Sequence, residues 1–133
     1  MQEELKDLNK QALGAAINHM GKVAWPTIIL TLLVCSLFVL CIAAFATGLI
    51  SVWLATPLVS VLTYMSYTPL HEAVHGNIHG NKANLRWVND RCGYLVAPLI
   101  GVPFASHKHE HFTHHRFTNI EGKDPDFLIS GMR

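Results

Sequence analysis

Charged residues are scarce in this chain, and one long stretch has none. Only 14% of the 133 residues are Asp, Glu, Lys or Arg, against about 25% in soluble globular proteins. Residues 23–70 contain none of these four types and no histidine. The net charge of +1 comes without a basic stripe or an arginine cluster, so we expect no nucleic-acid partner.

Cysteines are also few. Three cysteines cannot form a paired disulfide framework, and two of them, Cys35 and Cys41, lie inside the uncharged stretch. Free cysteines of this kind behave as small buried hydrophobic residues. We therefore expect a reducing or membrane environment.

The uncharged stretch predicts a membrane hairpin. One crossing needs about 20 apolar residues, so residues 23–70 suffice for two, near 27–47 and 50–70, with a turn at 46–48. About 22 polar-rich residues come first, which argues against a cleaved signal peptide. All ten Lys and Arg residues flank the hairpin, which by the positive-inside rule predicts that both flanks are cytoplasmic.

The predicted fold class is all-α, an integral membrane hairpin followed by cytoplasmic or interfacial helices. We expect an amphipathic cytoplasmic segment at 1–22, the hairpin at 23–70 and a histidine-rich region at 71–133. His19 should be a solvated surface residue. Residues 84–97 predict a helix with Leu85, Val88, Cys92, Leu95 and Val96 on one face, ended by Pro98. The segment 93–105 is expected to be interfacial or re-entrant.

Eight of the nine histidines lie between residues 71 and 115. The sequence HEAVH occupies 71–75, and Thr68 followed by Pro69 predicts the start of a helix there. On that helix His71, His75 and His79 would share one face.

A second group lies in SHKHEHFTHHRFTN, residues 106–119. Ser106 is a plausible N-cap for a helix that begins at His107. Such a helix places His107, His111, His114 and His115 in one stripe and turns His109 roughly 200° away. Histidines aligned on two helices predict a metal site.

The kind of metal follows partly from the ligand count. HEAVH also matches the zinc-hydrolase pattern, in which Glu72 would be the general base. One catalytic zinc takes three protein ligands and a water, which leaves at least four histidines without a role. Imidazole also suits iron and copper, and two metals side by side fit the surplus. The spacing does not distinguish iron from copper.

HEAVH at 71–75 and HFTHH at 111–115, with RFTN at 116–119 and KDPD at 123–126, resemble the first two histidine boxes of the membrane fatty acid desaturase superfamily. The resemblance implies a di-iron centre that uses O2 and an electron donor such as ferredoxin, rubredoxin or cytochrome b5. It implies iron ligation by His71, His75, His111, His114 and His115, with His79 and His107 as further candidates. Glu72 would then orient an imidazole, a role for which Asp90, Glu110, Asn119, Asp124 and Asp126 compete.

The resemblance implies an acyl-lipid desaturase or, as the alternative within the superfamily, a carotenoid hydroxylase or ketolase. The substrate would be a lipid or carotenoid taken from the bilayer. A non-catalytic membrane metal-binding or transport protein is the alternative from another class. The resemblance covers residues 25–126, about the first half of a typical member. The third histidine box is absent, because no histidine follows Arg116. We therefore expect a truncated reading frame or ligands supplied by another chain.

Overall fold

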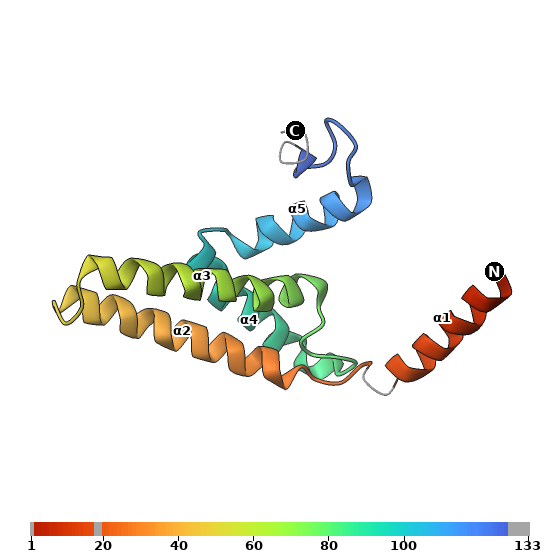
Figure 1. Ribbon diagram of the computed structural model, residues 1–133, viewed down its shortest axis with the longest axis horizontal. Helices are drawn as coiled ribbons and strands as arrows, with labels where there is room; N and C mark the ends of the chain where they lie inside the picture. Colours follow the sequence, from red (N-terminus) through yellow and green to blue (C-terminus); the bar gives the residue numbers. More distant parts are fainter. Residues whose placement is uncertain (1, 18–19, 128–133) are drawn as a thin grey trace.

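The fold is helical throughout the part of the chain that the computed structural model describes, residues 2–17 and 20–127. The elements are α1 (Gln2–Ala16), α2 (Trp25–Ala46), α3 (Val52–His75), a short 3-10 turn (Ala83–Leu85), α4 (Arg86–Ile100) and α5 (Phe104–Phe117) (Figure 1). The predicted all-α class is confirmed. His19 lies outside the described residues.

Helices α2 and α3 pack side by side in opposite directions (Figure 1). Their connection is a tight turn in which Gly48 has a φ of 75°, a conformation that glycine adopts without strain. Val34 is fully buried at this interface, and Cys41, Ala55 and Leu62 form a second small core nearer the turn. The turn lies where the sequence predicted it.

One of the two predicted membrane spans corresponds to a helix that is long and apolar enough to cross a membrane. Among the described residues, only α2 is both long and apolar enough to cross a membrane, with 22 residues and a mean hydropathy of 3.0. Helix α3 has the necessary length but contains more polar residues, including Thr56, Ser60 and Thr63. A second crossing by α3 stays a prediction.

The predicted helix start at Thr68 and Pro69 is wrong. Helix α3 runs without interruption from Val52 to His75, so the second apolar segment and the first histidine box are one helix. Proline inside a helix removes one backbone hydrogen bond. Packing against α4 offsets this cost, because Pro69, Leu70 and Val74 are all buried.

The prediction for residues 84–105 is also wrong in part. Helix α4 continues through Pro98 to Ile100, and α5 begins only four residues later at Phe104. Residues 93–105 are the end of one helix, a turn and the start of the next; their interfacial or re-entrant placement stays a prediction. The buried face of α4 consists of Asn89, Cys92, Gly93, Val96 and Ala97. Leu95, predicted on that face, is 50% exposed.

Two backbone hydrogen bonds connect the loop after α3 to the segment before α2. The backbone N–H of Ala24 donates to the carbonyl of Ile78 over 3.0 Å, and the N–H of Asn81 donates to the carbonyl of Gly21 over 3.0 Å. Ile78 is completely buried. By contrast, every residue of α1 is exposed, and α1 contacts no other helix within the described ranges.

Candidate metal centre

The first histidine pair lies on the last turn of α3. His71 and His75 are four residues apart and so share one helix face, with ring centroids 4.6 Å apart. The helix ends immediately afterwards, because Gly76 takes the left-handed conformation with a φ of 73°. Both imidazoles are half-buried at the end of the hairpin.

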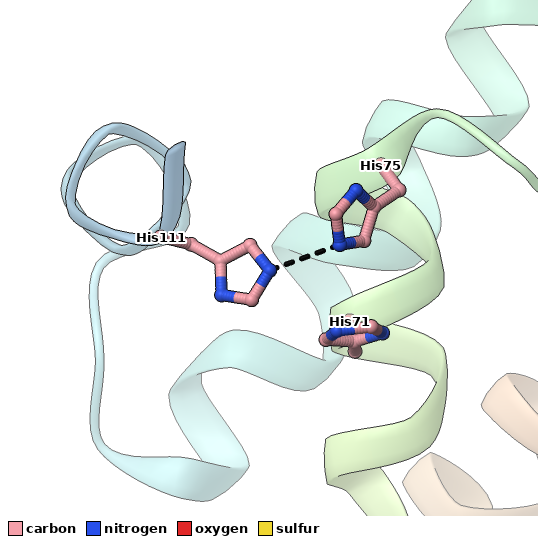
Figure 2. Close-up of side chains that lie close together, drawn as sticks. All are labelled: His71, His75 and His111. Atoms are coloured by element: carbon pink, nitrogen blue, oxygen red, sulfur yellow. Dashed lines mark hydrogen bonds between the residues drawn. The ribbon is translucent and has the colours of Figure 1, made fainter. Parts of the chain in front are cut away.

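Helix α5 brings the second group to the same place. It begins at Phe104 after Pro103, three residues earlier than predicted, and Ser106 does not cap it. His111 points from α5 toward the two rings of α3, as Figure 2 shows. Its ring centroid lies 4.9 Å from that of His71 and 4.8 Å from that of His75.

Five histidines form one continuous group, which we call the histidine cluster. Its members are His71 and His75 from α3 and His107, His111 and His115 from α5. The Nε2 atom of His111 lies 2.9 Å from Nε2 of His75 and 2.9 Å from Nε2 of His115. One ring nitrogen from each of His71, His75 and His111 lies within 4.8 Å of the other two. Convergent ring nitrogens of this kind suit a metal ion.

The environment favours the neutral form of two imidazoles of the cluster, His111 and His75. Burial, followed by the neighbouring rings of His115 and His71, lowers the pKa of His111 to about 4. Burial and the ring of His71 also lower the pKa of His75. A neutral imidazole keeps a lone pair for a metal, whereas a protonated one has none. The lowered pKa values of His75 and His111 therefore favour the ligating form of these two rings.

His114 lies beside the cluster but faces a carboxylate. Its Nδ1–H donates to Oδ1 of Asp124 over 2.8 Å, and Oδ2 of Asp126 is 3.6 Å away. The hydrogen bond to Asp124 raises the pKa of His114. Burial alone would raise the pKa of Asp124, but the hydrogen bonds from His114 and from the backbone N–H groups of Asn119 and Asp126 outweigh it and lower that pKa. This arrangement leaves Nε2 of His114 available as a ligand atom.

Of the six side chains predicted to compete for the orienting role, Asp124 is the one that accepts a short hydrogen bond from a histidine. Its side chain is only 1% exposed. Among the described residues, no hydrogen bond joins a histidine ring to Glu72, Asp90, Glu110 or Asn119, and Asp90 and Glu110 are exposed.

His79 does not share the face of His71 and His75, so that expectation is wrong. Helix α3 ends at His75, and His79 lies in the loop that follows. Its Nδ1 atom is buried and has no hydrogen-bond partner among the described residues, and the same is true of Nε2 of His107. Buried polar atoms without a partner are costly, which is consistent with ligand positions. His109 is exposed, as its predicted orientation requires.

Asn89 is a site-supporting residue that sequence reasoning missed. This side chain on α4 is 3% exposed and bridges two backbone groups around the first box. Its Nδ2 donates to the carbonyl of Ala73 over 2.8 Å, and its Oδ1 accepts from the N–H of Ile78 over 3.3 Å. Its position on the buried face of α4 was the available clue.

Comparison with known proteins gives the family. A family model described as fatty acid desaturase matches residues 47–132. The chain is 29% identical over 121 residues to the sn-1 oleoyl-lipid 12-desaturase of Anabaena variabilis, an alignment that covers 90% of this chain and 33% of that protein. The chain thus spans about one third of the length of this relative. No solved structure matches the chain. The match over residues 47–132, which include both histidine groups, shows that the chain belongs to the fatty acid desaturase family.

Proposed function

We propose that this chain forms the histidine-ligating part of a membrane di-iron enzyme that introduces a double bond into acyl lipids. The observation that carries the proposal is the convergence of imidazoles from α3 and α5 in the histidine cluster. Family membership supports an oxidoreductase that acts on lipids. Electrons would come from a redox partner such as ferredoxin, rubredoxin or cytochrome b5.

The residues fit a pair of iron ions by ligand type. His71, His75, His111, His114 and His115 are the proposed ligands. His79 and His107 are two further candidates, because each has a buried ring nitrogen with no hydrogen-bond partner in the described part of the chain. Iron with O2 supplies the oxidising power needed to remove hydrogen from an unactivated C–H bond. The chain's own part is to hold the imidazoles in place, and Asp124 orients the ring of His114 by accepting its Nδ1–H.

The proposed substrate is an acyl chain that enters from the bilayer. The cluster follows directly on the hairpin, so a lipid tail beside α2 and α3 can reach it without crossing water. The relative from Anabaena variabilis is named for action on an oleoyl lipid. The distribution of Lys and Arg supports placing the hairpin in the membrane with the histidines on the cytoplasmic side.

The test compares His111→Ala with His109→Ala in the complete reading frame that contains these residues. The host should supply both acyl lipids and carotenoids. Because His111 lies at the centre of the cluster and His109 is exposed, we expect His111→Ala to lose most of the bound iron and the new unsaturation. His109→Ala should retain both. Fatty acid chromatography and metal analysis of the purified protein measure these outcomes.

Three results would contradict the proposal. Hydroxylated carotenoid with unchanged acyl chains would assign the protein to the other substrate class. Labile zinc without iron would favour a non-catalytic metal-binding or transport protein. Unchanged iron in the His111→Ala variant would remove the second box from the ligand set.

A further inference from the structure

Helix α4 follows α3 and precedes α5 in the chain, and it carries no histidine. It packs against α3, behind which it runs in Figure 1, and it also contacts α5. Any displacement of α4 therefore changes the distance between the two halves of the histidine cluster.

The attachment of α4 to the first box is the amide of Asn89. The carbonyl that it binds belongs to Ala73, between His71 and His75, and the N–H that it accepts belongs to Ile78 in the following loop. A single buried side chain thus fixes both the last turn of α3 and the loop that carries His79. Water does not compete for these hydrogen bonds, because Asn89, Ala73 and Ile78 are all buried.

Helix α4 contacts the helix of the second box at Gly93, where the absence of a side chain leaves room for the ring of Phe104. The ring of Phe104 lies directly over Gly93, where a β-carbon would overlap the ring, and Tyr94 packs edge-on against the same ring with centroids 4.9 Å apart. Phe104 is 5% exposed and is the first residue of α5. His107 and His111 follow at three and seven residues, on the same face of α5. The packing of Phe104 over Gly93 therefore orients α5 so that its histidine face points toward α3.

We propose that Asn89 and Gly93, one turn apart on α4, are positioning residues that set the spacing between the two histidine boxes. The proposal extends the proposed function, because spacing matters only if both boxes bind the same metal centre. Asn89 holds the box on α3, Gly93 holds the box on α5, and α4 is the rigid element between them.

The first test uses Gly93→Ala, with Gly14→Ala as the matched control. Both substitutions replace a glycine inside a helix, but only Gly93 has a side chain over it; Gly14 has open space. The probe is Co2+ alone, titrated into the purified chain in detergent and followed by visible absorption. We expect Gly93→Ala to weaken Co2+ binding about tenfold or more and to change the absorption spectrum, the size of effect found for residues that orient ligands. Gly14→Ala should bind as the unmodified chain does.

A second substitution tests whether the effect passes through Phe104. Adding Phe104→Leu to Gly93→Ala makes room for the new methyl group, so part of the affinity and the original spectrum should return. At the other attachment, Asn89→Asp replaces a donor to the Ala73 carbonyl by an acceptor and should also weaken Co2+ binding. Asn84→Asp, at an exposed position, makes the same charge change and should not.

A merely stabilising role predicts a different pattern. If Gly93→Ala and Asn89→Asp lower the melting temperature but leave Co2+ affinity and spectrum unchanged, α4 does not position the boxes. The same conclusion follows if Phe104→Leu restores nothing in a folded protein.

A distance measurement separates failure of this inference from failure of the proposed function. Nitroxide labels at Thr68→Cys and Arg116→Cys, both exposed positions on α3 and α5, report the helix spacing without metal once Cys35, Cys41 and Cys92 are replaced by alanine. We expect Gly93→Ala to shift this distance and Phe104→Leu to return it. If the unmodified chain binds no Co2+ but the distance shifts, the metal function fails and the positioning role stands. An unchanged distance overturns the positioning role.

Discussion

The side chain of His114 differs from the other histidines of the second box because it has a buried carboxylate as partner. Asp124 accepts from Nδ1–H of His114 and stabilises the protonated ring. We expect Asp124→Ala to bring the pKa of His114 down toward its ordinary value near 6.5, because the stabilising partner is lost. Metal affinity should fall about tenfold, since the ring is no longer held in one tautomer. NMR titration of labelled histidine in the metal-free chain measures the first effect, and metal titration the second.

The control for this prediction is Asp126→Ala. Oδ2 of Asp126 is 3.6 Å from Nδ1 of His114, beyond hydrogen-bond distance, and the side chain is 56% exposed. Its removal should move the pKa of His114 much less than removal of Asp124. Equal shifts in the two variants would show that general charge, and not the hydrogen bond, determines the protonation of His114.

Spacing along the sequence was enough to predict which histidines of one helix share a face, but not how the site is supported. His71 and His75, like His111 and His115, are four residues apart, and helix geometry alone places each pair on one face. The role of Asn89 depends on two backbone groups that only the packing of α4 against α3 brings near. His79 was misplaced because the left-handed turn at Gly76 ends the helix one residue after His75.

At the scale of elements, the loop 76–82 depends on its close contact with the segment before α2. Gly80 has a φ of 58°, and a β-carbon there would overlap the backbone carbonyls of Gly21 and Lys22. Gly80→Ala should therefore suffer both backbone strain, about 1–2 kcal/mol, and overpacking, about 1–3 kcal/mol. Thermal unfolding in detergent should show a melting temperature several degrees below that of the unmodified chain.

Gly122→Ala is the matched control for this prediction. Gly122 has a similar φ of 73°, but no atom lies within 4 Å of the position of its β-carbon. The control variant carries only the backbone strain and should unfold at a higher temperature than Gly80→Ala. Identical melting temperatures would mean that the contact with residues 21–24 contributes nothing to stability.

The existence of the five α-helices could be predicted from the sequence, whereas several of their boundaries could not. On local grounds Pro69 indicates the start of a helix and Pro98 indicates the end of one. Both nevertheless lie inside helices, because the buried faces of α3 and α4 pack on each other. Ser106 has the chemistry of an N-cap, but seating Phe104 over Gly93 starts α5 earlier. In each case tertiary packing outweighs a local preference.

At the scale of the whole molecule, the outer surface of the hairpin is apolar. Many large hydrophobic side chains along α2 are 41–65% exposed, among them Ile29, Leu32, Val39 and Leu40. Continuous apolar surface of this kind is rare on soluble monomers. At 1.5 Å per residue, the 22 residues of α2 extend about 33 Å, close to the roughly 30 Å of a bilayer core. The surface and the length together favour insertion into lipid.

The orientation of the hairpin gives a prediction that does not depend on metal binding. Ser51 lies in the turn between α2 and α3, and Ser106 lies in the first turn of α5; both are exposed. If both helices cross the membrane, the two positions lie on opposite faces. A membrane-impermeant maleimide should label Ser106→Cys only from the cytoplasmic face and Ser51→Cys only from the other face.

The unmodified chain is the control, because Cys41 and Cys92 are buried and Cys35 is half-buried, so its labelling should be weak from either side. Labelling of both variants from the cytoplasmic face would mean that the hairpin does not cross, and α2 and α3 would then lie within one leaflet or along its surface. Labelling of both from the other face would place the histidine cluster outside the cytoplasm and away from soluble electron donors such as ferredoxin.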